Sequence, residues 1–146
     1  MSAVNAFETE LLELLFNNDP IANIGDGTGL TCGTADSAQV SLHTVALDDT
    51  DTLLTADECD YTGYVRQTVA RTAGGWTIAG DSCTNAALIQ FGNMSAGASD
   101  TAVHCGIGLI STGDVLRIHA AIGTPLVVNI GVNPQFAIGA LEITLE

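Results

Sequence analysis

The sequence is poor in basic side chains. Its 146 residues contain three arginines and no lysine against 17 acidic residues, which gives a formal net charge of −14. A surface of this sign repels the phosphates of nucleic acid and of anionic lipid. We therefore expect neither nucleic acid nor a membrane surface as the partner.

Aromatic residues and long apolar runs are also scarce. Aromatics make up 5% of the chain, and no segment approaches the roughly 20 apolar residues that span a bilayer. Glycan sites usually place exposed aromatic rings beside carboxylates or amides, so the low aromatic content disfavours a glycan-binding role.

Two explanations of the acid excess are open. The acids could complement a partner surface or a cation, or they could keep the protein soluble in high salt, where screening removes their mutual repulsion. The acids are scattered along the chain and lysine is absent, which favours the second explanation. We therefore expect a halophilic host.

The four cysteines contain no C-x-x-C pair, so a zinc site is not expected. Cys83 and Cys105 are predicted to be buried free thiols that act as small apolar residues. Cys32 and Cys59 lie in polar, loop-like sequence, where a disulfide and two free thiols are both open.

The first 18 residues predict an amphipathic helix that precedes the rest of the chain, residues 19–146. Asn5 is expected to cap this helix, and Glu8 to complete a capping box. Asn18 and Pro20 end it, because asparagine tolerates the left-handed conformation and proline cannot continue a helix. An apolar stripe this wide must be covered by the domain itself or by a neighbouring subunit. The stripe consists of Phe7, Leu11, Leu14 and Leu15, and Leu12 and Phe16 broaden it.

After the helix the pattern changes to short segments of alternating character separated by Gly, Asp and Pro turns. This spacing is typical of an antiparallel β-sandwich, and eight strands fit a jelly-roll-like arrangement in one domain. No internal repeat is present. The predicted strands are 39–45, 61–72, 75–80, 85–92, 101–110, 114–122, 125–132 and 136–146.

Candidate catalytic residues do not converge in the sequence. His43, His104 and His119 lie within or at the edge of predicted strands, and no Ser-His-Asp or Cys-His order stands out. We therefore expect no enzymatic activity and no cofactor.

The densest acidic segment is a predicted loop that contains Asp48, Asp49 and Asp51. These three are weak candidates for a calcium site, because carboxylate oxygens suit that ion but EF-hand spacing is absent. A solvated loop is the favoured interpretation. Asn93 begins an Asn-Met-Ser glycosylation triplet in another predicted loop.

Two of the three arginines, Arg66 and Arg71, lie in one stretch with the only tryptophan, Trp76. Arginine suits bidentate, partly buried ion pairs, so each is expected to contact a carboxylate within the fold or across a subunit contact. Trp76 alternates with Ile78, which predicts that both face the core.

Several segments together resemble a family of small tailed-phage virion proteins, often labelled tail fibre or head decoration proteins. They are "NAFETELLELLFNN", "SLHT", "YTGYVRQTVAR", "GGWTI", "NAALIQF", "AVHCGIG" and "FAIGALEITLE". The resemblance covers nearly the whole chain, and departs from the family where Cys105 replaces an aromatic residue.

The resemblance implies a virion component made in the host cytoplasm, with no catalytic residues. We expect a head decoration protein that binds and stabilises the assembled capsid. Its expected partners are copies of itself, as a homotrimer, and the major capsid protein or other virion proteins. The alternative is a tail or fibre component that takes part in host attachment.

Overall fold

The computed structural model describes residues 3–22, 24, 36–110 and 113–145, and these residues form a mainly β protein with an N-terminal helix. Helix α1 (Asn5–Leu12) continues as a π-helical turn, η1 (Glu13–Asn17). Nine strands follow within the described residues. They are β1 (Ser37–His43), β2 (Gln67–Ala70), β3 (Trp76–Ala79), β4 (Ser82–Asn85), β5 (Ile89–Gln90), β6 (Asp100–Gly108), β7 (Ile118–Val128), β8 (Gln135–Phe136) and β9 (Glu142–Thr144).

The strands form three sheets with the orders β2-β1-β6-β7, β3-β4-β9 and β5-β8. The pairs β1/β6, β6/β7, β3/β4 and β4/β9 are antiparallel. The predicted class, mainly β with antiparallel sheets and an N-terminal helix, is therefore confirmed.

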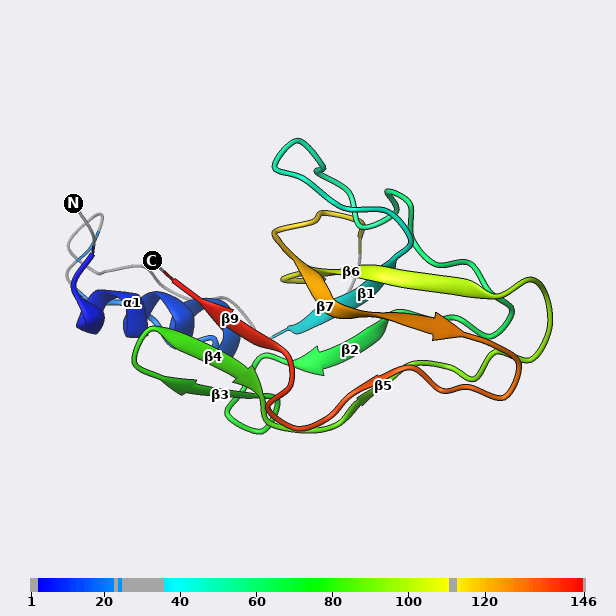
Figure 1. The fold of residues 1–146 in the computed structure, drawn as a ribbon. Helices are drawn as coiled ribbons and strands as arrows, with labels where there is room; N and C mark the ends of the chain where they lie inside the picture. The colour runs from blue at the N-terminus through cyan, green and yellow to red at the C-terminus, as the bar shows by residue number, and fades with distance from the viewer. Residues whose placement is uncertain (1–2, 23, 25–35, 111–112, 146) are drawn as a thin grey trace. The chain divides into compact units, whose positions relative to one another are not determined.

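The chain divides into two compact units (Figure 1). Unit 1 combines Met1–Asp36, Ala70–Ile89 and Phe136–Glu146, and unit 2 combines Ser37–Val69 and Gln90–Gln135. Each unit is built from segments that are distant in sequence, and each is described by itself below.

In unit 1 the helix packs on β3 and β4. Leu12 and Phe16 are fully buried, and the Phe16 ring lies 4.7 Å from that of Trp76, measured between ring centroids. Trp76 is therefore a core residue, as predicted. The Nη2 of Arg71 donates to the carbonyl of Leu14 at 2.8 Å, and its Nε donates to the carbonyl of Leu15. Arg71 therefore caps the end of the helix.

Unit 1 buries only part of the predicted helix stripe. Phe7 is 37% exposed, and the other three stripe residues are half-buried. The buried positions are Glu8 together with Leu12 and Phe16, the two residues that broaden the stripe. Burial of the stripe by a partner remains a prediction.

The predicted capping box is wrong. Val4 is the N-cap, its carbonyl accepts from the amides of Phe7 and Glu8, and the cap has no side-chain hydrogen bond. The helix end matches the prediction, because Asn18 adopts the left-handed conformation with φ 59°.

In unit 2, strand β1 is buried on both faces. Its alternate residues Ala38, Val40 and Leu42 form an apolar face, and every one is fully buried. Ser41 and His43 lie on the opposite, polar face, and both are also fully buried. The weak alternation seen in the sequence therefore marks a strand with two covered faces.

Strand β7 runs through a predicted turn. Positions 123–125 were expected to reverse the chain, but β7 pairs with β6 on both sides of them. Ala102 pairs with Leu126 and His104 with Ala121, so β7 contains three extra residues opposite Val103. The Gly and Pro of this segment therefore make a β-bulge, which is one of the places where a sheet accepts them.

The cysteine predictions can be checked in part. Cys83 and Cys105 are buried free thiols, as predicted, and Cys59 is also a buried free thiol. Burial raises the pKa of Cys59 and of Cys83 to about 12. Cys32 lies outside the described residues. Asn93 is exposed, as the prediction of a loop requires.

Candidate functional site

The segment 44–60, called the acidic loop here, covers part of the sheet of unit 2. It contains six of the eight acidic residues of that unit. Leu47 and Leu54 point inward and form an apolar cluster with Leu116, against which Ala56 packs. These buried leucines fix the loop on the sheet, whereas Asp48, Asp49 and Asp57 are exposed.

Backbone hydrogen bonds fasten the loop at several points along its length. The Leu54 amide donates to the carbonyl of Asp114 at 2.6 Å, and the Leu116 amide donates to that of Thr52 at 3.0 Å. Near the base, the amide of Thr44 donates to Asp57, and that of Cys59 donates to Leu42. The loop is therefore a defined part of the fold.

His43 is held beneath the loop. Its Nδ1 lies 2.7 Å from the Ala56 carbonyl, which can only accept, so Nδ1 carries a proton. Its Nε2 lies 2.7 Å from the Ser41 hydroxyl, which also reaches the Gly106 carbonyl. Burial lowers the pKa of His43 and favours the neutral ring. The Ser41–His43 pair thus resembles a nucleophile with its base, but both side chains are fully buried and fasten the loop to the sheet.

The other two histidines also contact the loop. The Nδ1 of His104 accepts a hydrogen bond from the amide of Leu47 at 3.1 Å. His119 stacks on His104 with 6.2 Å between ring centroids, and its Nε2 lies 3.4 Å from a carboxylate oxygen of Asp49. Each of the three histidines therefore contacts a residue of the acidic loop.

The candidate calcium ligands mostly make local bonds. Asp48 accepts from both the amide and the hydroxyl of Thr50, which lowers the pKa of its carboxyl, and Asp51 accepts from the amide of Asp48. Within the described residues, no group of three His, Cys, Asp or Glu side chains is arranged to hold a metal ion.

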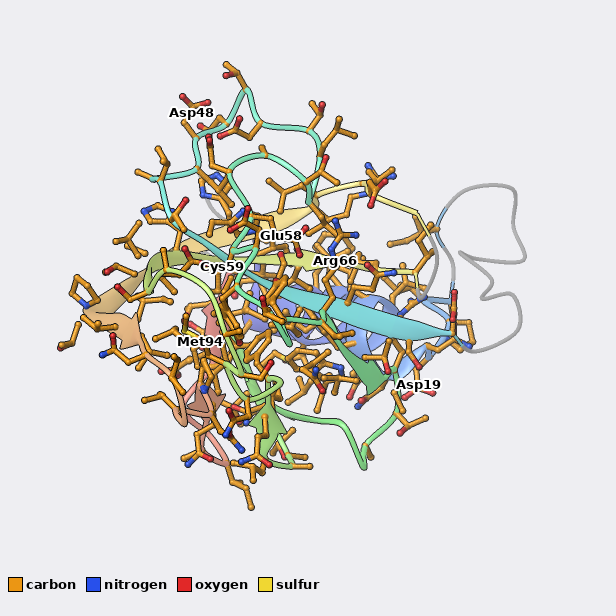
Figure 2. All side chains as sticks on the ribbon, turned by 90° about the vertical axis from the view of Figure 1, so that its right-hand side faces the viewer. Asp19, Asp48, Glu58, Cys59, Arg66 and Met94 are labelled. Carbon is orange, nitrogen blue, oxygen red and sulfur yellow. The ribbon has the colours of Figure 1, made fainter. Side chains whose placement is uncertain are left out.

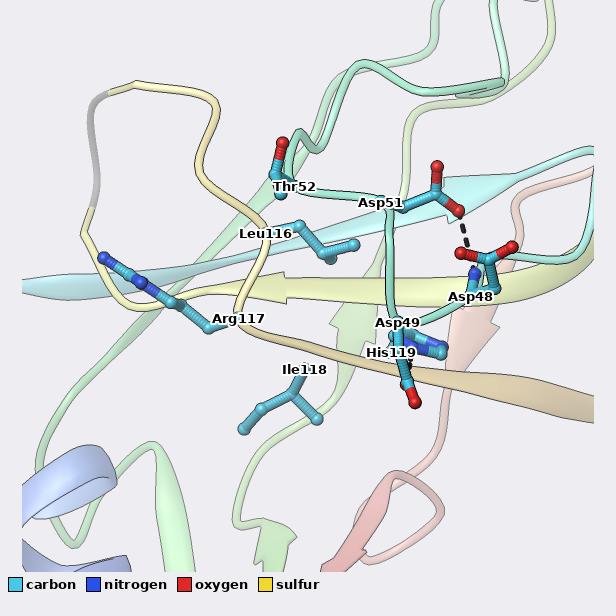
Figure 3. A pocket seen from close by; sticks show the side chains of 8 residues that line it. All are labelled: Asp48, Asp49, Asp51, Thr52, Leu116, Arg117, Ile118 and His119. Atoms are coloured by element: carbon cyan, nitrogen blue, oxygen red, sulfur yellow. Dashed lines mark hydrogen bonds and ion pairs between the residues drawn. The ribbon is translucent and has the colours of Figure 1, made fainter.

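A pocket of about 420 Å³ lies beside these residues (Figure 3). Leu116 and Ile118 supply an apolar wall, and the acidic loop and Arg117 supply charge of both signs. Its lining consists of Asp48, Asp49, Asp51, Thr52, Leu116, Arg117, Ile118 and His119.

Arg66 contacts the acidic loop through Glu58. Its Nε and Nη2 each lie 2.7 Å from an oxygen of Glu58, a bidentate pair. Its Nη1 lies 2.6 Å from Asp114 and 3.1 Å from Gln39. Figure 2 shows Glu58 and Arg66 side by side, with Asp48 at the outer end of the loop. The prediction that Arg66 meets a carboxylate is therefore confirmed.

Sequence patterns missed the residues that complete this network. The Tyr64 hydroxyl donates to Glu58 at 2.7 Å and accepts from the Leu42 amide at 2.9 Å. Burial raises the pKa of Tyr64. The available signal was that Tyr64 and Arg66 share one face, but nothing in the sequence places Asp114, 48 residues away, beside them.

Arg71 contacts the end of the helix in unit 1. The hydrogen bonds described above go to the carbonyls of Leu14 and Leu15 at the helix end. The guanidinium therefore fixes the helix in unit 1, and its contact with a carboxylate stays a prediction.

One family of known proteins matches nearly the whole chain. No helix among the described residues is long and apolar enough to cross a membrane. A search of curated proteins finds no match. The family model described as "Podophage GP4 fiber I protein gp80" matches residues 3–144. This match covers both units, and the chain therefore belongs to that family of phage virion fibre proteins.

Proposed function

We propose that this protein decorates the outside of a phage head, where it binds the assembled capsid and stabilises it. The observation that supports this proposal is the acidic loop, which presents carboxylates outward while leucines, histidines and Arg66 hold it in place. A charged surface that is already ordered loses little conformational entropy on binding and complements a basic surface of the capsid protein. The major capsid protein is the proposed partner, and the protein itself is proposed to be a homotrimer.

The proposal assigns no catalysis to the chain. A reacting pair must reach its substrate, and the Ser41–His43 pair is sealed beneath the loop. The surface histidine, His119, lies against Asp49, with no nucleophile among its described contacts.

A second candidate is a fibre component that contacts the host. The description of the family as a fibre protein is consistent with this candidate. So is the pocket beside the acidic loop, where carboxylates, Arg117 and an apolar wall could hold a polar ligand. In this case the protein would be found on the tail, and its partner would be a host surface molecule.

Localisation on the particle tests the two candidates. Purified protein is mixed with tail-free capsid shells, and its position on whole particles is imaged by electron microscopy with a specific antibody. Binding to shells that saturates at regular sites supports decoration. Labelling confined to the tail, with no binding to shells, would overturn it.

Charge-neutral variants test the proposed binding surface. The pair Asp49→Asn and Asp57→Asn removes two exposed loop charges, and asparagine also accepts the left-handed backbone of Asp57. The matched control is Asp19→Asn with Asp81→Asn, which removes two exposed charges from unit 1. We expect shell binding to weaken at least about tenfold in the loop variant alone. Equal binding by both variants would contradict the assignment to the loop.

A further inference from the structure

One edge of the main sheet in unit 2 differs from the rest of the unit in charge. Strand β7 is bonded on one side only, to β6, in the described part of the chain. Along its exposed stretch from Ala120 onward, and through the turn that follows, no side chain is ionisable until Glu142. In a chain of net charge −14, this uncharged edge is an exception that needs a physical reason.

The edge is exposed and partly apolar. Val127 is 52% exposed and Ile130 in the following turn is 69% exposed, whereas the side chain of Val128 is fully buried, so Val128 offers only its backbone at this edge. Strand β1, at the centre of the same sheet, is buried on both faces, whereas most residues of β7 are exposed. Figure 1 shows β7 next to β6, the strand with which it pairs.

Natural proteins usually protect an edge strand with charged side chains, a proline or a bulge. Strand β7 has the bulge, with Pro125 inside it, but lacks charge in its second half. The bulge leaves only the short regular stretch from Leu126 to Val128 beyond it. A contact made here is therefore short and fixed in register, which prevents open-ended strand stacking.

From these observations we infer that the edge formed by Leu126–Val128 and Ile130 binds a second copy of this chain. Two copies that each bear −14 repel one another wherever their carboxylates meet, so they can approach closely only through an uncharged surface. In unit 2 six of the eight acids lie on the acidic loop. Asp100 on β6 is paired with Val128, but its carboxylate accepts hydrogen bonds from the amides of Asp60 and Tyr61, so the β7 edge itself remains the favourable approach. A basic partner would instead be drawn to the loop. The inference rests on the proposed self-association and assigns it to a surface.

A charge placed in the contact tests the inference. Val127→Asp introduces a carboxylate at the edge, and Ile130→Asp introduces one outside the strand, where the β6 ladder is not disturbed. The matched control is Val65→Asp, the same substitution at a residue that is 63% exposed elsewhere in unit 2. Sedimentation equilibrium over a range of protein concentrations gives the association constant, and far-UV circular dichroism checks folding.

We expect the wild type to associate and both edge variants to weaken association at least about tenfold, because a carboxylate buried in a contact loses its hydration. Val65→Asp should change the association constant less than twofold. A monomeric wild type, or equal effects at the edge and at Val65, would overturn the inference. Shell binding by a monomeric protein would leave the decoration role intact, whereas association through this edge without shell binding would refute that role alone.

Discussion

Removing Arg66 should destabilise unit 2 more than any other loss of a basic residue there. In Arg66→Ala, Glu58 loses both bonds of the bidentate pair and keeps the hydroxyl of Tyr64. Asp114 and Gln39 each lose one bond as well. The carboxylate of Glu58 then lies in a partly buried site without its cation.

The magnitude follows from burial. The side chains of Arg66 and Glu58 are 18% and 14% exposed, which places the pair between an exposed pair worth about 0–1 kcal/mol and a buried one whose disruption costs about 3–5 kcal/mol. Asp114 is 52% exposed, so its pair with Arg66 contributes less than about 1 kcal/mol. We expect Arg66→Ala to lower the free energy of unfolding by about 2–3 kcal/mol. Arg66→Lys keeps the charge but loses the fork, so it should cost about 1–2 kcal/mol.

Urea denaturation followed by far-UV circular dichroism measures both variants, and Arg117→Ala serves as the control because Arg117 is exposed. The control should stay within about 0.5 kcal/mol of the wild type. If Arg66→Ala does the same, the bidentate pair contributes nothing to stability, and our account of how the acidic loop is anchored fails.

Four further predictions concern packing, pH and salt. Gly106→Ala should cost about 1–3 kcal/mol, because an added Cβ would lie 2.8 Å from His43 Nε2, whereas Gly123→Ala, with open space around it, should change stability by less than about 0.5 kcal/mol in the same urea assay. The pKa of His43 is lowered in the fold, so the unfolded chain binds a proton at this residue more readily than the folded chain does. The stability of the protein should therefore be complete above pH 6.5, the ordinary pKa of histidine, and should fall as the pH drops through 6.5. A urea midpoint that does not change with pH would refute this. Leu12→Ala should cost about 2–5 kcal/mol, and Phe7→Ala far less, because the helix buries the first residue and leaves the second 37% exposed. The melting temperature should rise with KCl toward molar concentrations as carboxylate repulsion is screened, and a falling melting temperature would count against a halophilic origin.

The sequence predicted those features that depend on local chemistry. The β class, the left-handed Asn18, the buried Trp76 and the ion pair of Arg66 each follow from a residue type and its immediate neighbours. The turn after β3 was also predicted, although the strand that follows it, β4, was not, because its polar residues give no apolar alternation.

The predictions that were wrong concern features that depend on contacts between segments distant in the sequence. Positions 123–125 look like a turn in isolation, but pairing with β6 on both sides extends them into β7. Only part of the helix stripe is buried, because packing on β3 and β4 decides which of its side chains are covered. The three histidines gave no sign of a common role, since the register of β1, β6 and β7 is what brings them under one loop.

The acidic loop covers a polar face of β1, whereas the opposite face of that strand is apolar. Releasing the loop would expose Ser41, His43 and their carbonyl partners, which water can satisfy, together with a cluster of only three leucines. The heat capacity change of such an opening is therefore small beside that of unfolding the whole unit, because heat capacity follows the apolar area exposed. The free energies of loop opening and of global unfolding should therefore depend differently on temperature. The acidic loop can then open and close while the apolar face of β1 stays covered.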